Sequence, residues 1–202
     1  MKRLIAMLAA LLLLALPAMA EEDRQPMVNA AYLAVILEGA PYTSIQPDSR
    51  TIGGCSVVRF TVVDLDGDGI QEVVLEVTEP EGFIILTCHT DGMVYGGEMP
   101  YRGMLQLKDD GTCSFSSGAM DGGVSRLCFA TNMETGKPDA FGRFNLAESV
   151  SQADGTVRYT LDCGAQTTDE AGYHAFLEAQ GAKLDALWYD YTQENLRLLL
   201  GQ

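Results

Sequence analysis

Oxygen-bearing side chains are concentrated in residues 64–72, whose sequence is DLDGDGIQE. Carboxylates occupy every second position at its start, and Gly67 and Gly69 follow two of them. Calcium binds about six to eight oxygen atoms, supplied by carboxylates and main-chain carbonyls. Glycines permit the positive φ angles that a tightly curled ligand loop requires. This pattern predicts a calcium-binding loop.

The spacing also predicts the ligands. We expect the side chains of Asp64, Asp66 and Asp68 to bind the ion, together with the main-chain carbonyl of Ile70. Glu72 would complete the shell, directly or through a water molecule. Crowded carboxylates repel one another when no cation is bound, so we expect a structural ion that holds the chain reversal together. The alternative is a metal-free acidic turn, because Asp-Gly pairs are also common in hairpins.

The residues around the loop distinguish between two kinds of calcium loop. An EF-hand has a bidentate Glu at the twelfth loop position and flanking helices, whereas that position here is Leu75 and both flanks alternate like strands. The D-x-D-G-D-G-x-x-E segment between two predicted strands resembles instead the calcium loop of FG-GAP/VCBS-type repeats. The resemblance implies the same five ligand residues. It covers residues 60–77 in a single copy, so it does not imply a propeller fold.

Other chemistry-bearing residues form no motif. The five cysteines contain no C-x-x-C pair, and their odd number leaves at least one thiol unpaired. The sequence is compatible with two disulfides and also with buried free thiols. His89 and His174 stand apart from other ligand-type residues, so they predict neither a zinc site nor a triad. We therefore predict no catalytic residues.

The elements that position the loop read as an α+β fold. Apolar residues 27–37, followed by Gly39, predict an N-terminal helix. Closely spaced alternating segments then predict an antiparallel meander, which we expect to form a single twisted sheet. The expected strands are residues 58–62, 73–77, 83–89, 93–98, 104–108, 112–116, 125–131, 141–146 and 156–162. The N-terminal helix and further helices at the C-terminus are expected to cover one face of that sheet.

The C-terminal part carries helix signals and aromatic residues. Thr167 and Glu170 match a capping box before a helix that ends at Gly181, and Thr192 can cap a last short helix. Residues 188–191 contain Trp188, Tyr189 and Tyr191. We expect these rings at the seam where the last helices meet the sheet. A sugar-stacking platform is the alternative.

The N-terminal sequence and the net charge indicate where the protein is located. Residues 1–20 have a basic start, an apolar middle and an A-x-A end, which predicts a signal peptide cleaved near Ala20. Residues 21–202 would then form a single secreted globular domain without membrane insertion. Removing residues 1–20 takes away two of the 13 basic residues and none of the 28 acidic ones, leaving a net charge of −17. Such a surface repels nucleic acid and anionic lipid.

These observations predict a secreted, calcium-stabilised binding or interaction module whose partner is an extracellular protein or glycan. The overall layout also resembles that of small secreted bacterial proteins, which implies a location and a loop rather than an activity. An extracellular hydrolase acting on polymers or glycans is the main alternative, and an inhibitor presenting its sheet face is a third. Two close carboxylates in a cleft away from residues 64–72 would favour the hydrolase. An open, aromatic sheet face would favour the binding module.

Overall fold

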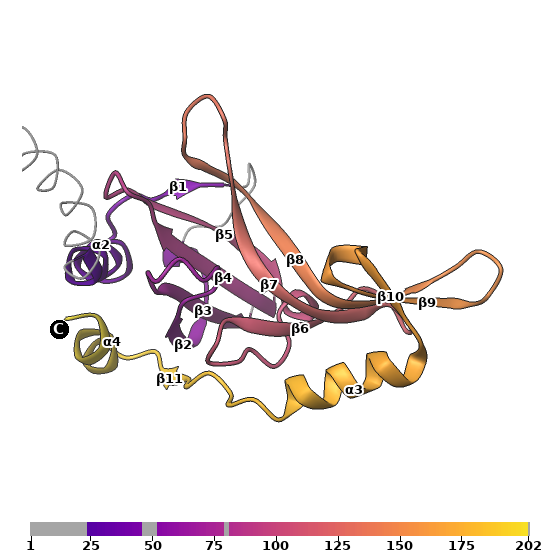
Figure 1. The fold of residues 1–202 in the computed structure, drawn as a ribbon. Helices are drawn as coiled ribbons and strands as arrows, with labels where there is room; N and C mark the ends of the chain where they lie inside the picture. The colour runs from indigo at the N-terminus through magenta and orange to yellow at the C-terminus, as the bar shows by residue number, and fades with distance from the viewer. Residues whose placement is uncertain (1–23, 46–51, 79–80, 202) are drawn as a thin grey trace, which may run out of the picture.

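The computed structural model describes residues 24–45, 52–78 and 81–201 (Figure 1). The predicted signal peptide, residues 1–20, lies outside this part of the chain. Two sheets pack on each other, and helices cover them from outside. The predicted α+β class, with an N-terminal helix and C-terminal helices around antiparallel strands, is confirmed. Among the described residues, no helix is both long and apolar enough to cross a membrane.

The helices are α2 (Arg24–Glu38), α3 (Glu170–Gly181) and α4 (Gln193–Leu200). The first sheet contains β1 (Thr43–Ser44), β2 (Val57–Val63), β3 (Glu72–Thr78), β4 (Glu81–Cys88), β5 (Val94–Pro100) and β11 (Tyr189–Asp190). The second contains β6 (Thr112–Ser116), β7 (Gly122–Thr131), β8 (Pro138–Ser151), β9 (Val157–Leu161) and β10 (Gln166–Thr168). Single 3₁₀ turns are η1 (Ile52–Gly54), η2 (Tyr101–Gly103) and η3 (Asp162–Gly164).

The prediction of a single sheet is wrong. The first sheet has the order β1-β5-β4-β3-β2-β11 and the second the order β10-β9-β8-β7-β6. Both are antiparallel meanders except that β1 runs parallel to β5. β1 covers only Tyr95 and Gly96 at the outer edge of β5, and after η2 the chain does not pair with β5 again. It begins a new sheet that packs on the first one (Figure 1).

The first sheet is buried on both faces because its side chains alternate between two hydrophobic clusters. The helix-side cluster lies under α2 and α4 and includes Tyr32, Phe60, Leu75, Ile84, Leu196 and Leu200. The inter-sheet cluster lies on the opposite face and includes Val63, Val74, Ile85, Cys113 and Leu127. α2 and α4 therefore cover one face of the first sheet, as predicted, while the second sheet covers the other. α3 packs instead on the second sheet, against strands β7 to β10.

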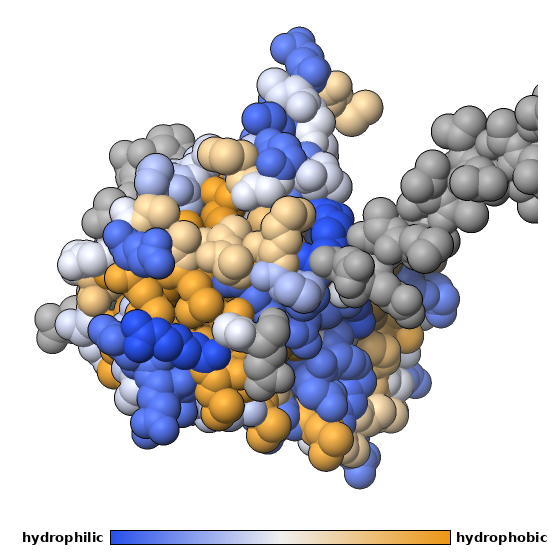
Figure 2. Space-filling model, turned by 90° about the vertical axis from the view of Figure 1, so that its left-hand side faces the viewer, coloured by the Kyte–Doolittle hydropathy of each residue, from blue (hydrophilic) through white to orange (hydrophobic). Residues whose placement is uncertain are grey.

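The face formed by α2 and α4 keeps apolar side chains at the surface. Figure 2 views the molecule from this side and shows hydrophobic residues gathered beside hydrophilic ones. Met27 of α2 and Leu198 of α4 are 56% and 57% exposed. The opposite side of α2 is buried through residues such as Val28 and Tyr32. This arrangement explains why the sequence of α2 is apolar nearly all round.

The capping residues predicted for the two C-terminal helices are only partly correct. Asp169, not Thr167, caps α3, because its Oδ1 accepts a hydrogen bond from Gly172 N at 2.8 Å. Thr167 lies in β10, two residues too early to reach the helix. Thr192 caps α4 as predicted, with its Oγ1 accepting from Asn195 N at 3.1 Å.

The three C-terminal aromatic residues do not lie on one surface. Trp188 packs against the inter-sheet cluster, with its ring centroid 6.0 Å from that of Phe83. Tyr189 and Tyr191 pack against the helix-side cluster. Neighbouring residues of an extended segment point to opposite sides, which separates the rings. The predicted seam with the last helices therefore holds for the tyrosines and is wrong for Trp188, and the three rings form no common stacking platform.

Candidate functional site

The β2–β3 hairpin holds the predicted loop. Val63 pairs with Glu72 across the hairpin, so the strands bring the two ends of residues 64–72 together. Gly67 and Gly69 adopt φ angles of +84° and +87°, the left-handed values for which glycine was expected. The flanks are strands, as the comparison with EF-hands required.

Three of the predicted ligands converge. Asp64, Asp66 and Glu72 each offer a carboxylate oxygen, and these oxygens lie within 4.8 Å of one another. Oxygens bound to one calcium ion, each at about 2.3–2.6 Å, can be up to about 5 Å apart. Glu72 is only 1% exposed, whereas Asp64 and Asp66 are partly exposed. The acidic group can therefore hold a metal ion at the end of the hairpin.

Glu72 is the buried member of this group. Its Oε2 accepts a hydrogen bond from Leu65 N at 2.8 Å, and its Oε1 accepts one from Thr87 Oγ1 at 3.2 Å. Burial raises the pKa of Glu72 well above its ordinary value, and the charges of Asp66 and Asp68 raise it further. Burial and the neighbouring Asp68 also raise the pKa of Asp66. A cation would compensate both effects, because it favours the ionised carboxylates.

Asp68 and Ile70 have other roles in the described geometry. Asp68 lies outside the group of three, and its Oδ1 accepts a hydrogen bond from Ile70 N at 2.7 Å. The side chain of Ile70 is buried in the helix-side cluster. Asp64 also shapes the loop, since its two oxygens accept from Gly67 N at 2.6 Å and from Gly69 N at 3.0 Å. Calcium binding by the Asp68 carboxylate and the Ile70 carbonyl stays a prediction.

The loop contacts both layers of the protein. On the helix side, Tyr32 donates its hydroxyl hydrogen to Gln71 O at 3.1 Å, and Gln71 N donates to Gln25 Oε1 at 3.0 Å. On the other side, Arg126 of β7 lies against the loop, where a Cβ added to Gly67 would be 2.6 Å from its Nη1. Arg126 also donates to Asp110 O at 2.9 Å. An ion in this loop would therefore support contacts of the hairpin with α2 and with the second sheet.

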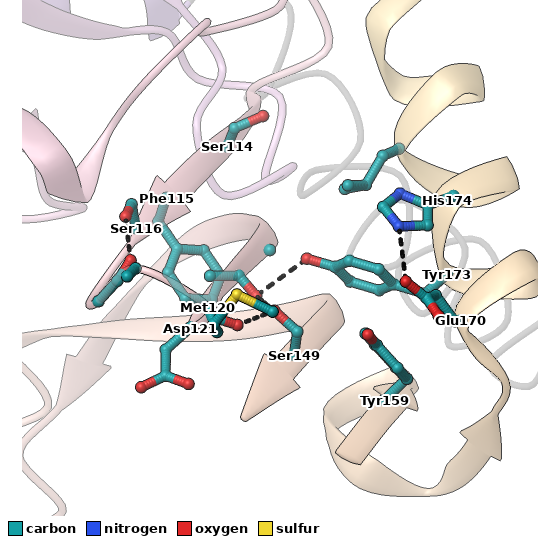
Figure 3. A pocket seen from close by; sticks show the side chains of 15 residues that line it. Ser114, Phe115, Ser116, Met120, Asp121, Ser149, Tyr159, Glu170, Tyr173 and His174 are labelled. Carbon is teal, nitrogen blue, oxygen red and sulfur yellow. Dashed lines mark hydrogen bonds and ion pairs between the residues drawn. The ribbon is translucent and has the colours of Figure 1, made fainter. Parts of the chain in front are cut away.

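A second candidate site is a cavity of about 340 Å³ between α3 and the β6–β7 hairpin, which we call the α3 cavity (Figure 3). Sequence reasoning missed it, because its walls come from segments far apart in the chain and carry no local motif. Its lining includes Phe115, Ser116, Met120, Asp121, Ser149, Tyr159, Glu170, Tyr173 and His174.

The carboxylates of the α3 cavity do not resemble a hydrolytic pair. Asp121 and Glu170 lie on opposite sides of the view in Figure 3. Hydrogen bonds with Ser151 lower the pKa of Asp121, which makes it a poor proton donor. The Glu170 side chain is 72% exposed and lies 3.7 Å from His174 Nε2. A general acid for glycoside cleavage needs a raised pKa, so this geometry gives the hydrolase alternative no support.

The cysteines and histidines form no further centre among the described residues. Cys88 and Cys113 are buried thiols, whereas Cys128 and Cys163 are exposed thiols. A framework of two disulfides needs four of the five cysteines. Because these four are thiols, the described residues contain no such framework. His89 lies 3.5 Å from Asp91 Oδ1, and its ring meets that of Tyr95 edge-on.

Comparisons with protein-family models, with curated proteins and with solved structures each found no match to this chain.

Proposed function

We propose that the protein is a secreted binding module whose β2–β3 hairpin is stabilised by a structural calcium ion. The convergence of Asp64, Asp66 and Glu72 within 4.8 Å carries this proposal. The donors are all oxygen atoms, which suits calcium or magnesium rather than zinc. Asp68 and Ile70 would join the shell after a small rearrangement of the loop. The resemblance to FG-GAP/VCBS-type loops favours calcium.

The extracellular location rests on the predicted signal peptide and agrees with the expected affinity. Calcium sites of extracellular modules have dissociation constants on the order of 10⁻⁴–10⁻³ M. A site of this class is filled where calcium is abundant and stabilises the fold there. The partner would be an extracellular protein or a glycan.

Thermal unfolding tests the ion. Binding contributes about 2.7 kcal/mol when free calcium is about 100 times the dissociation constant. For a chain of this size that raises the midpoint by about 5–10 °C. We expect this rise, relative to EDTA, in about 10 mM calcium, which is about 100 times a dissociation constant of 10⁻⁴ M. The rise in magnesium should be smaller, because magnesium requires stricter octahedral geometry.

Variants locate the ion. Asp66→Asn should abolish the calcium response, because it removes one of the three converging carboxylates. Asp139→Asn, which changes an exposed acid of β8 by the same charge, should leave the response intact. Asp68→Asn tests whether the fourth carboxylate joins the shell. An unchanged midpoint over millimolar calcium would contradict the proposal, and an unaltered response of Asp66→Asn would place the ion elsewhere.

A further inference from the structure

The α3 cavity has an aromatic and apolar lining. The rings of Tyr159 and Tyr173 lie against each other, with centroids 5.0 Å apart and an interplanar angle of 34°. Phe115 and Met120 line the facing side, and Met120 is 59% exposed. Figure 3 shows Tyr159 and Tyr173 opposite these residues, with Glu170 above Tyr159 at the first turn of α3. The cavity volume of about 340 Å³ lies at the lower end of the range for small-ligand pockets.

Three hydroxyl groups of this cavity donate their hydrogens to the main chain. Tyr173 Oη donates to Gly122 O at 3.2 Å. Ser149 Oγ lies within hydrogen-bond distance of both Met120 O, at 2.9 Å, and Gly122 O, at 3.2 Å. Ser116 Oγ donates to Gly118 O at 3.1 Å. These three hydroxyls therefore have no hydrogen left for a ligand.

The exposed carboxylate of Glu170 offers an open acceptor at the rim. Glu170 is largely exposed, and its described partner is His174 at 3.7 Å, beyond a good hydrogen bond. Asp121 is instead engaged by Ser151, whose N donates to Oδ1 at 2.6 Å and whose side chain forms a second hydrogen bond. At the β6 end, Arg102 donates to Ser116 Oγ at 3.0 Å, so a basic residue of the protein already occupies that end. The open acceptor lies at the α3 end, beside the tyrosine rings.

We propose that the α3 cavity binds a basic group, a guanidinium or alkylammonium, over the ring of Tyr159 and next to the carboxylate of Glu170. A basic group donates hydrogen bonds, which the exposed Glu170 carboxylate can accept. The faces of aromatic rings attract cations. The net charge of −17 for residues 21–202 adds attraction at long range. A neutral sugar lacks the positive charge that this carboxylate and the ring face attract. This inference rests on the proposed function in one respect, since the cavity would be the ligand site of the proposed binding module.

The basic group can come from a polypeptide side chain or from a free polyamine, and a titration separates the two sources. The purified protein is titrated with N-acetylarginine amide, N-acetyllysine amide, spermidine and a neutral trisaccharide, and amide chemical shifts are followed by NMR. We expect weak, saturable binding of the basic probes, with shift changes around Tyr159 and Glu170. If the amino-acid amides bind at least as tightly as spermidine, the basic group comes from a polypeptide side chain. If spermidine binds more tightly, the ligand is a free polyamine. Both orders support the basic-group site.

Paired variants test the two contacts. Glu170→Gln should weaken binding about three- to fivefold, as expected for an exposed charge pair. Tyr159→Leu should weaken it by a similar factor through loss of the ring face. Glu178→Gln removes the same charge from the exposed side of α3 and should leave affinity within twofold.

Equal weakening by Glu170→Gln and Glu178→Gln would overturn the site, because it would mean attraction by net charge alone. Absence of saturable binding, or binding of the trisaccharide alone, would overturn it as well. The calcium response of the thermal midpoint is measured separately, so failure of this site and failure of the proposed calcium module are distinguishable.

Discussion

The side chain of Lys108 is buried to 4% exposure, and its Nζ contacts three oxygen atoms. It donates to Gly181 O at 3.3 Å, to Lys183 O at 3.2 Å and to Asp185 Oδ1 at 2.7 Å. Two of these acceptors are main-chain carbonyls at the C-terminal end of α3, where a positive charge is favourable. Lys108 therefore attaches α3 to the segment that leads into β6. A buried amine serves here as a structural donor.

Lys108→Met keeps the length of the side chain but removes the charge and all three hydrogen bonds. We expect a loss of about 3 kcal/mol in the free energy of unfolding, because the carbonyls lose a buried charged donor. Urea denaturation measures this loss. Asp185→Asn is the control: its side chain is 77% exposed, so the loss should stay below about 1 kcal/mol. Equal losses for the two variants would contradict the role of the main-chain contacts.

At the scale of elements, the turn formed by residues 109–111 joins three parts of the molecule. Asp110 accepts a hydrogen bond from Lys183 Nζ, with an ion-pair distance of 2.8 Å, beyond the end of α3. Gly111 packs against the start of the candidate calcium loop, where a Cβ would be 2.2 Å from Asp64 O. Arg126 of β7 donates to Asp110 O. This turn therefore positions the loop and the helix together on the second sheet.

The Asp110 carboxylate should make stability depend on pH. Partial burial alone would raise its pKa, but hydrogen bonds from Lys183 and Thr112 outweigh burial and lower the pKa to about 2. The folded protein then binds this proton less tightly than the unfolded chain, whose pKa lies near 3.8. The stabilisation is complete above that value and is lost as pH falls through the folded pKa.

We therefore expect Asp110→Asn to lower the thermal midpoint at pH 6, and this difference from the unaltered protein to shrink between pH 4 and pH 2. A difference that stayed constant over that interval would show that the Asp110 charge does not contribute.

Gly111→Ala should destabilise the protein more than an equivalent change in an isolated turn. Gly111 and Gly155 have similar φ angles of +78° and +83°, so alanine is strained at both positions. At Gly111 an added Cβ would clash with main-chain atoms, whereas no atom lies within 4 Å of a Cβ added at Gly155. We expect Gly155→Ala to cost about 1 kcal/mol and Gly111→Ala at least twice as much. Gly111→Ala should also weaken the calcium response. Similar costs in thermal unfolding would contradict the close approach.

At the scale of the whole molecule, the first sheet links the two hydrophobic clusters. Its strands β2, β3 and β4 present alternate side chains to α2 and α4 on one face and to the second sheet on the other. Trp188 reports on the inter-sheet side, since it packs near Phe83 and lies under the Arg59 guanidinium, 4.6 Å from the ring centroid. Neither sheet can therefore lose its packing without exposing a face of the other.

This shared core predicts a single cooperative unfolding transition. Trp188 fluorescence and far-UV circular dichroism should have the same midpoint. Leu127→Ala, in the inter-sheet cluster, should lower both midpoints together and cost about 3 kcal/mol. Two separate midpoints in the unaltered protein would mean that the second sheet unfolds on its own.

Local patterns in the sequence were sufficient for several elements. The strands on either side of the loop, the antiparallel pair expected from residues 83–89 and 93–98, and the Thr192 cap all occur as predicted. In each case, the deciding contacts join residues close in sequence. The fold class is predictable for the same reason. Asp169 rather than Thr167 caps α3 because β10 extends through Thr168, and that pairing depends on β9.

By itself, the sequence determined the hairpin, its acidic loop and the alternation that buries both faces of the first sheet, because short-range spacing encodes each of them. Only the tertiary structure decided that the strands form two sheets, since that depends on packing between residues far apart in the chain, such as Val74 and Leu127 of the inter-sheet cluster. It also selected Asp64, Asp66 and Glu72 as the converging acids and turned Asp68 towards Ile70 N. The α3 cavity depends most on tertiary structure, because Phe115, Tyr159 and Glu170 meet only after a helix has packed across the second sheet.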